Sequence, residues 1–374
     1  MKIALLGTRG VPANYGGFET FYEELGKRLV ERGHDVTVYC RDSYYPDKLD
    51  EYLGMKLVYL PNIKKKALDT LSHTFFSIIH AIRQPYDVYM VCNAANSPVL
   101  FIPRLLGKHI AINTDGLEWK RGKWGKVART YYKVCERIST LLAHRVVADS
   151  RGIQDYYSSE YHTATTFIPY GAYLSESRKP ELLEKLHIRP GEYFLQITRF
   201  EPENNPLLTI QAYKQLDTNK KLVIIGGVPY ESGYSRKIAE ETVGYPNIIL
   251  PGSIYDKELL NEIWCNSFAY IHGNEVGGTN PALLQTMASG CFTIAIDVSF
   301  SRDVLEDAGV YFGKNVQALA NQMQWALENG QLLTYYKDRA IKRIRLHYSW
   351  DKVTIEYEDL FVEMVNGTSS KVFT

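Results

Sequence analysis

The feature that most constrains the fold is an alternation of short apolar runs with amphipathic helical stretches. The chain opens on an apolar run over Lys2–Leu6, continues through a glycine-containing loop and a helical stretch that ends at Gly33, and reaches a second apolar run at Asp35–Cys40. Strand, helix and strand in this order indicate a βαβ unit with parallel strands. Because the alternation continues along the chain, we predict an α/β fold built on parallel sheets.

The predicted strands fall into two series, separated near residue 170. They lie at 2–6, 35–40, 56–60, 88–92, 109–113, 145–148 and 166–168 in the first series, and at 193–198, 222–225, 248–250, 268–271 and 292–296 in the second. A chain of 374 residues is also too long for one hydrophobic core of ordinary size. We therefore expect two Rossmann-like, doubly wound domains over 1–170 and 171–349, and a C-terminal helix over 350–366.

Composition points to the cytoplasm. The five cysteines are scattered and form no CxxC pair, which favours a reducing compartment and argues against a zinc site or a disulfide framework. The first apolar run is too short for the apolar core of a signal peptide. No other run approaches the roughly 20 apolar residues of a membrane-spanning helix.

The two halves of the chain differ in charge. Residues 1–170 carry 23 Lys and Arg against 17 Asp and Glu, whereas residues 171–374 carry 20 against 25. This asymmetry predicts that the first half meets an anionic partner. Ten of its cations lie between Arg104 and Arg145, and the run Lys64–Lys66 adds three more.

A helical stretch within this basic region has apolar residues at helical spacing, which are Val127, Tyr131, Val134, Ile138 and Leu142. Two interpretations stay open. A basic, partly apolar face can lie on anionic lipid at the inner face of the cell membrane. Alternatively, the apolar stripe packs on the sheet and the cations are solvated.

Two segments of the first half have the composition of ligand-binding loops. The loop Gly7–Gly17 leaves a strand and enters a helix, where backbone N–H groups favour an anion, and Gly16 with Gly17 lets a ligand approach the backbone. It lacks the G-x-G-x-x-G dinucleotide fingerprint, and a tight turn with helix packing is the alternative. The second segment follows a strand and carries a carboxylate among cations and tryptophans, an arrangement suited to a polyhydroxyl acceptor. Its residues are Asp115, Glu118, Trp119, Lys120 and Arg121.

Two segments of the second half suit a diphosphate. Arg199 follows a strand, where a guanidinium can hold two phosphate oxygens, and Glu203 and Asn204 come next in the loop. Further on, the run Gly277, Gly278, Thr279 and Asn280 precedes a helix opened by Pro281, which forms a nest of backbone donors. Gln285 lies one turn into that helix, within reach of a ribose. His272, at the end of the preceding strand, is expected to position the ligand or to act as a nucleophile or base.

Several motifs are absent from the chain. It contains no D-x-D, which argues against a metal-bridged diphosphate, and neither G-x-x-x-x-G-K-[ST] nor G-x-S-x-G. We therefore expect no metal and no cofactor.

Taken together, these segments resemble glycosyltransferase family 4. The helix ending in RGHDV and the segment IPYGAY occur in the family's order, and LLGTRGVPANYGGFETFYEEL, DGLEWKR and VGGTNPALLQTMASG are similar to its bacterial rhamnosyltransferase branch. The resemblance implies a GT-B fold, in which two Rossmann-like domains face a cleft and the last helix crosses back to the first domain. It also implies a retaining transfer, with a nucleotide-sugar donor bound as a substrate in the second domain and the acceptor bound in the first.

By position, the resemblance gives Gly16, Gly17, Arg199 and the 277–280 nest to the donor phosphates, and Asp115 and Lys120 to the acceptor and the catalytic region. Two departures stand out. Asn204 replaces the family's usual basic residue after Glu203. Gly277 and Gln285 replace the two acids of the family's E-x7-E motif, so neither acid is present.

The expected reaction is therefore transfer of a sugar, foremost L-rhamnose from dTDP-rhamnose, in bacterial surface polysaccharide synthesis. The expected acceptor is a saccharide or a polyprenyl-diphosphate-linked saccharide, and nucleic acid is not expected as a partner. The alternatives are a GT-B sugar-nucleotide epimerase, a family 4 transferase using a UDP-sugar, and a binding protein without catalysis.

Overall fold

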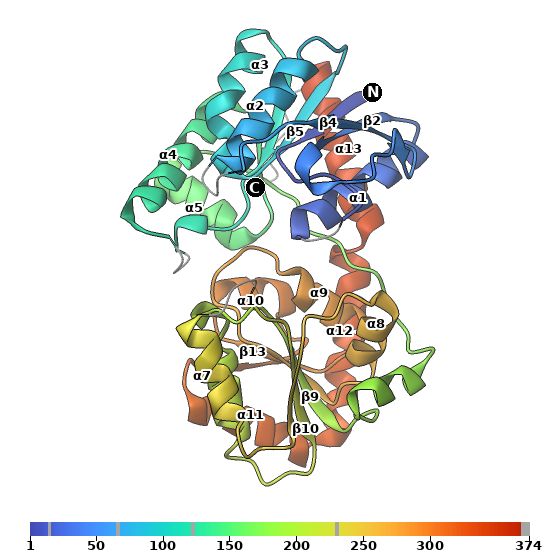
Figure 1. Ribbon diagram of the computed structural model, residues 1–374, viewed down its shortest axis with the longest axis vertical. Coiled ribbons are helices and arrows are strands. Elements are labelled where there is room, and N and C mark those ends of the chain that lie inside the picture. Colours follow the sequence, from blue (N-terminus) through green and yellow to red (C-terminus); the bar gives the residue numbers. More distant parts are fainter. Residues whose placement is uncertain (14–15, 65–67, 121–123, 229–231, 368–374) are drawn as a thin grey trace. The chain divides into compact units, whose positions relative to one another are not determined.

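The chain forms two compact units (Figure 1). The computed structural model describes residues 1–13, 16–64, 68–120, 124–228 and 232–367. The first unit combines Met1–Gly171 with Trp350–Thr374, and the second is Ala172–Ser349. The first unit is therefore assembled from two separate stretches of the chain.

The first unit contains an eight-stranded sheet in the order β3-β4-β2-β1-β5-β6-β7-β8. Its strands are β1 (Lys2–Leu6), β2 (Asp35–Arg41), β3 (Glu51–Tyr52), β4 (Met55–Leu60), β5 (Val88–Cys92), β6 (His109–Asn113), β7 (Arg145–Ala148) and β8 (Thr166–Phe167). All neighbours pair in parallel except β3 and β4. Because β2 and β5 lie on opposite sides of β1, the winding reverses between β1 and β5.

The helices of the first unit cover the sheet. They are α1 (Gly17–Glu31), α2 (Asp69–Ala81), α3 (Phe101–Leu105), α4 (Lys126–Leu142), α5 (Arg151–Tyr161) and α13 (Trp350–Asn366). The last of them packs against α1, where Phe21 and Tyr357 place their ring centroids 5.2 Å apart. Glu358 also meets His34 Nε2 at 2.7 Å, and Asn113 Nδ2 donates to Tyr357 Oη at 3.1 Å.

The second unit contains a six-stranded, all-parallel sheet in the order β11-β10-β9-β12-β13-β14. Its strands are β9 (Tyr193–Ile197), β10 (Lys221–Ile225), β11 (Ile248–Gly252), β12 (Ala269–His272), β13 (Thr293–Ile296) and β14 (Val310–Phe312). Here the winding reverses between β9 and β12.

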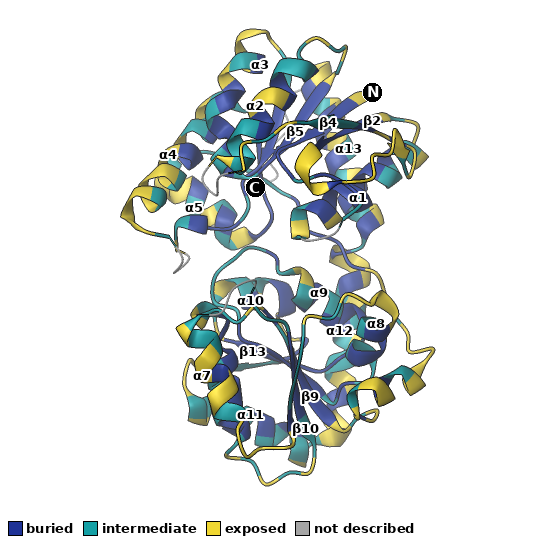
Figure 2. Ribbon diagram, viewed as in Figure 1, coloured by how far each residue is buried: buried dark blue, intermediate teal, exposed yellow. Residues whose placement is uncertain are grey.

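The helices of the second unit follow the strands in turn. They are α6 (Pro206–Tyr213), α7 (Gly233–Thr242), α8 (Lys257–Cys265), α9 (Pro281–Ala288), α10 (Ser299–Leu305), α11 (Val316–Glu328) and α12 (Leu333–His347). The central strands β9, β10, β12 and β13 are buried, and the outer helix faces are exposed (Figure 2). One core layer includes Phe194, Ile224, Phe292 and Met323, and the other includes Tyr193, Leu195 and Ile263. The predicted fold class, two Rossmann-like α/β units, is confirmed.

None of the helices described is both long enough and apolar enough to cross a membrane.

Candidate active site

The second unit presents its polar loops at the reversal point of its sheet. In open parallel sheets, ligands bind outside the carboxyl ends of the strands where the winding reverses. Arg199 follows β9 and His272 ends β12, and these strands are neighbours in the sheet. The structure therefore brings Arg199, Glu203, His272 and the Gly277–Asn280 turn to one edge.

The loop after β9 is held in shape by Asn204. The Asn204 side-chain amide donates to the Arg199 carbonyl at 3.0 Å, and Gln196 Nε2 donates to the Asn204 carbonyl at 3.1 Å. Asn204 is buried, whereas Arg199 is exposed and Glu203 is half-buried. Asn204 thus shapes the backbone that carries the Arg199 guanidinium.

A clamp joins this loop to the loop after β12. Asn205 Nδ2 donates to the Gly273 carbonyl at 2.8 Å and to Glu275 Oε1 at 2.6 Å, and Lys314 Nζ lies 2.7 Å from the same carboxylate oxygen. A Cβ at Gly273 would lie 2.6 Å from the Asn204 carbonyl oxygen, so the approach requires glycine. Sequence reasoning missed Asn205, Glu275 and Lys314. Asn205 adopts a positive φ of 56°, a conformation that Asn tolerates. The signal available in the sequence was therefore the residue type, an asparagine just before Pro206.

The turn before α9 is the predicted phosphate nest. Gly277 has φ 153°, a conformation that disfavours other residues. Asn280 is the N-cap of α9, and its Oδ1 accepts from the backbone N–H groups of Ala282 at 2.9 Å and Leu283 at 3.4 Å. Pro281 has no N–H. Because the cap already engages the first amides of the helix, a phosphate would rely on the backbone of 277–279.

His272 is buried at the end of β12, and its Nδ1 has no hydrogen-bond partner among the described residues. Desolvation lowers the pKa of His272 to about 4. The imidazole is therefore neutral near pH 7.

Gln285 uses its amide NH₂ inside the second unit. Gln285 Nε2 donates to Ser175 Oγ at 2.8 Å, and it lies 3.4 Å from both the Tyr173 carbonyl and Ser289 Oγ. This arrangement points the amide nitrogen at residues 173–175. The carbonyl oxygen is then the atom of the Gln285 amide that is suited to accept from a ligand.

In the first unit, two carboxylates of α1 hold the loop between β1 and α1. Glu19 Oε1 accepts from Arg9 N at 3.0 Å, and Glu23 Oε2 accepts from Ala13 N at 2.8 Å. Gly16 is the N-cap of α1, and a Cβ built there would lie 2.4 Å from Glu19 Oε2. A carboxylate therefore stands at the start of α1, where Gly16 and Gly17 were predicted to meet the donor phosphate.

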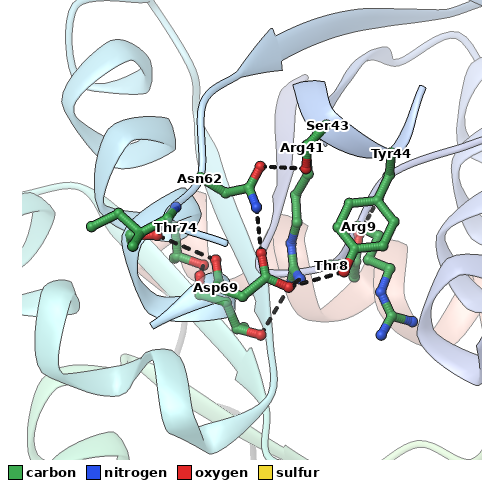
Figure 3. Close-up of polar contacts among 12 residues, drawn as sticks. Thr8, Arg9, Arg41, Ser43, Tyr44, Asn62, Asp69 and Thr74 are labelled. Carbon is green, nitrogen blue, oxygen red and sulfur yellow. Dashed lines mark hydrogen bonds and ion pairs between the residues drawn. The ribbon is translucent and has the colours of Figure 1, made fainter. Parts of the chain in front are cut away.

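A polar cluster lies at the carboxyl end of β2 (Figure 3). Asp69 accepts from Arg41 Nη1 at 2.7 Å, from Tyr44 Oη at 3.1 Å and from Asn62 Nδ2 at 2.5 Å. The Arg9 guanidinium carbon lies 5.3 Å from the centroid of the Tyr44 ring. Desolvation, the largest cause, lowers the pKa of Arg41 despite its partner Asp69. The cluster ties the first residue of α2 to the sheet edge, and sequence reasoning did not identify it.

The segment after β6 carries the predicted acceptor residues. Asp115 adopts φ 66°, its N–H donates to Asn113 Oδ1 at 3.1 Å, and its Oδ1 accepts from Gly116 N at 2.8 Å. A 3₁₀ turn, η3 (Glu118–Lys120), follows. Glu118 is buried and accepts from Trp124 Nε1 at 3.2 Å.

Lys120 is exposed, and its Nζ lies 5.5 Å from the centroid of the Trp119 ring. Trp119 is half-buried, and the Lys133 Nζ lies 4.3 Å from the same ring. Arg121 lies outside the described residues. The assignment of these residues to an acceptor stays a prediction, as do the donor roles in the second unit.

Comparison with known proteins first defines the class of fold. The chain is similar to sucrose-phosphate synthase from Thermosynechococcus elongatus, with a TM-score of 0.81 and 18% identity over 98% of this chain and 100% of that one. It is also similar to Anabaena HepE in complex with UDP, with a TM-score of 0.79 and 14% identity over 97% and 100% of the two chains. HepE in complex with UDP-glucose gives a TM-score of 0.78 at 14% identity, with the same coverage. The chain has the GT-B fold.

The family matches divide the chain in the same place as the fold. Residues 179–343 match the family described as Glycosyl transferases group 1, and residues 1–173 match a domain of unknown function, DUF1972. The second unit is therefore a glycosyl transferases group 1 domain. A 61-residue stretch is 38% identical to an uncharacterized 42.6 kDa protein in the cps region of Klebsiella pneumoniae, and the match spans 16% of the length of each chain.

Proposed function

We propose that this protein is a retaining, metal-independent glycosyltransferase that moves L-rhamnose from dTDP-rhamnose to a saccharide or lipid-linked saccharide acceptor, in bacterial surface polysaccharide synthesis. The observation that carries the transferase assignment is the coincidence of two findings in the second unit. Residues 179–343 match the glycosyl transferases group 1 family, and Arg199 lies with the Gly277–Asn280 turn at the reversal point of the same sheet.

The leaving diphosphate accepts charge as the glycosidic bond breaks, so catalysis depends on donors placed where that charge develops. Arg199 is exposed just after β9, on a loop fixed by Asn204. The backbone of 277–279, between β12 and α9, supplies neutral N–H donors at the same edge of the sheet. We propose that these groups stabilise the diphosphate in place of a metal ion. His272 is neutral and buried, which suits positioning the ligand rather than carrying charge.

The proposed mechanism uses no carboxylate of the protein as a nucleophile. We propose that the acceptor hydroxyl attacks on the face from which the diphosphate leaves, and that the diphosphate takes the proton. Asp115 and Lys120 would orient the acceptor hydroxyl. The proposed retention of configuration follows from this same-face attack and from the resemblance to family 4.

The choice of nucleotide rests on Gln285. Its NH₂ is engaged with Ser175, so one carbonyl oxygen serves the ribose. One acceptor satisfies the 3′-hydroxyl of a deoxyribose but serves a vicinal pair of hydroxyls poorly. This supports dTDP over UDP as the carrier. HepE was solved with UDP and with UDP-glucose, so a UDP-sugar is the outcome that would displace this part of the proposal.

A nucleotide-release assay tests the proposed reaction. We expect free dTDP to form from dTDP-rhamnose only when a lipid-linked saccharide acceptor is present, and the product to keep the donor's anomeric configuration. Interconversion of free nucleotide-sugars without an acceptor would instead identify an epimerase. Nucleotide binding without any turnover would identify a binding protein. A thermal-shift screen of donors should come first, because a bound ligand raises the apparent stability by mass action.

A further inference from the structure

Helix α4 packs on the first unit through a small and polar face. Cys135, Glu136 and Ser139 are buried, and the Ser97 hydroxyl donates to the Cys135 carbonyl at 2.6 Å. Ser97 belongs to η2 (Ala94–Leu100), the 3₁₀ segment that α4 covers. The fully buried residues of α4 are therefore small or polar ones.

Three apolar residues of α4 form an outward stripe, which coincides with the predicted stripe only in part. Val127 is 87% exposed, Val134 is 50% exposed and Leu141 is 61% exposed. They are spaced seven residues apart, which is close to two turns at about 3.6 residues per turn, so they follow one line along the helix. The interpretation in which the predicted stripe packs on the sheet is thus wrong for Val127 and Val134, whereas Ile138 and Leu142 of that stripe are half-buried.

Helix α3 adds further exposed apolar surface. It continues directly from η2, the segment beneath α4, and its last residue Leu105 is 81% exposed. Leu106 and Phe101 are exposed as well. Figure 2 shows exposed segments on both α3 and α4. Exposed apolar side chains gathered on neighbouring elements mark an interaction surface more often than scattered ones do.

The cations of α4 form a second line beside the apolar stripe. Lys126, Arg129, Lys133 and Arg137 are exposed, and each directly precedes or lies near a residue of the stripe. Within α4, all of which the structure describes, the sole carboxylate is Glu136. It is turned inward, where its Oε2 accepts hydrogen bonds from Tyr156 Oη at 2.9 Å and from Tyr161 Oη at 2.8 Å. The charged groups of α4 that face outward are thus all cations, and they lie beside apolar side chains.

We propose that the outward surface of α3 and α4 docks on an anionic lipid bilayer. Apolar side chains enter the boundary between headgroups and acyl chains, and cations beside them meet lipid phosphates. The surface reaches the predicted acceptor segment, because Lys133 Nζ lies 4.3 Å from the Trp119 ring. Docking would bring a membrane-held acceptor to that segment. Delivery of an acceptor rests on the proposed function, whereas the binding of lipid does not depend on it.

Co-sedimentation with vesicles tests the proposal directly. We would use phosphatidylcholine vesicles with and without phosphatidylglycerol, in the absence of any polyprenyl lipid and of any nucleotide. Binding to the anionic vesicles at low salt is expected, with a loss as salt rises. No binding to anionic vesicles at low salt, or equal binding to neutral ones, would overturn the proposal.

Substitutions separate the two components of the surface. Lys126→Gln with Arg129→Gln should weaken vesicle binding by about 25-fold, at about fivefold for each cation removed. Lys342→Gln with Arg345→Gln removes the same charge from exposed positions on α12 and should leave binding unchanged. If both pairs weaken binding equally, net charge rather than this surface is responsible, and the proposal fails.

The apolar component has its own matched pair. Val127→Ser should weaken binding severalfold, since a largely exposed valine would be buried in lipid. Val243→Ser, at a 77% exposed position in the second unit, is the control and should have no effect. A Val127→Ser protein that binds like the unmodified one would reduce the contact to a charge effect and refute docking by insertion.

Calorimetry with dTDP keeps this proposal distinguishable from the proposed function. The α4 variants should bind dTDP as the unmodified protein does. Loss of vesicle binding with intact dTDP binding would support the docking surface, whether or not the rhamnosyl assignment holds. Failure of the unmodified protein to bind dTDP would count against the proposed donor and leave the vesicle result standing.

Discussion

Substitution of Gln285 by glutamate isolates the nucleotide preference in one side chain. In the unmodified protein, Gln285 Nε2 donates to Ser175 Oγ at 2.8 Å and lies 3.4 Å from the Tyr173 carbonyl. With Gln285→Glu, the Ser175 hydroxyl can rotate and donate to the new carboxylate. The Tyr173 carbonyl has no hydrogen to donate, so in Gln285→Glu it faces a carboxylate oxygen instead of the amide N–H.

The magnitude follows from these contacts. Loss of the weak Tyr173 contact should cost about 1 kcal/mol of folding free energy or less, and it affects both nucleotides alike. The carboxylate, in contrast, can accept from both hydroxyls of a ribose. One added charge-assisted hydrogen bond strengthens UDP binding relative to dTDP by about 1–3 kcal/mol, a factor of roughly 5 to 150 in the ratio of dissociation constants.

Calorimetry with dTDP and UDP on both proteins measures this ratio. We expect the unmodified protein to bind dTDP at least as tightly as UDP, and Gln285→Glu to move the preference toward UDP. Gln317→Glu is the control, because it adds the same charge at an exposed position on α11 and leaves the contacts of Gln285 intact, so the ratio should stay as it is. A strong UDP preference in the unmodified protein, or the same ratio in Gln285→Glu, would refute the argument that this residue reads the ribose.

Three further predictions concern the second unit. Arg199→Ala should lower kcat/KM by about 2–4 kcal/mol of transition-state stabilisation and leave folding intact, whereas Arg189→Ala, at an exposed position before β9, should leave the rate unchanged. A folded and fully active Arg199→Ala protein would remove this residue from the mechanism. Turnover should persist in excess EDTA, and loss of activity that magnesium or manganese restores would show that a metal holds the diphosphate. The pKa of His272 is about 4 in the folded protein, below the value of about 6.5 in an unfolded chain, so its contribution to stability is present above pH 6.5 and is lost as pH falls toward 4. Urea unfolding at pH 7.5 and pH 5 should show that His272→Gln loses about 2 kcal/mol less over this interval than the unmodified protein, and equal losses would mean that His272 titrates normally.

Most of the fold was predictable because its strands are buried on both faces. Such strands appear as continuous apolar runs between turn residues. Val88–Cys92 and His109–Asn113 were predicted at their observed bounds. Two strands were missed, β3 and β14, which have two and three residues. At that length a strand is defined by its neighbour, since β14 exists through its pairing with β13.

The position of the candidate site residues at the sheet edge could be predicted from the sequence, but the hydrogen bonds and ion pairs that join their loops could not. A polar residue after a buried strand lies at the carboxyl edge, so Arg199 could be placed there from the sequence. The clamp of Asn205, Glu275 and Lys314 depends on how three loops close on one another, and no local pattern encodes that. Asn280 shows the same limit. Its position before Pro281 suited both a phosphate ligand and a helix cap, and only the geometry identifies the cap.

The non-contiguous first unit has a consequence for the order in which the protein matures during synthesis. Domains generally fold as units while the chain leaves the ribosome from its N-terminus. Here the first unit begins folding first and is completed last, because α13 is translated only after all of Ala172–Ser349. Until then, the surface of α1 around Phe21 lacks the Tyr357 ring that packs on it. A nascent or truncated chain ending before residue 350 would therefore present an aromatic surface to chaperones, and residues 1–171 expressed alone would be expected to aggregate.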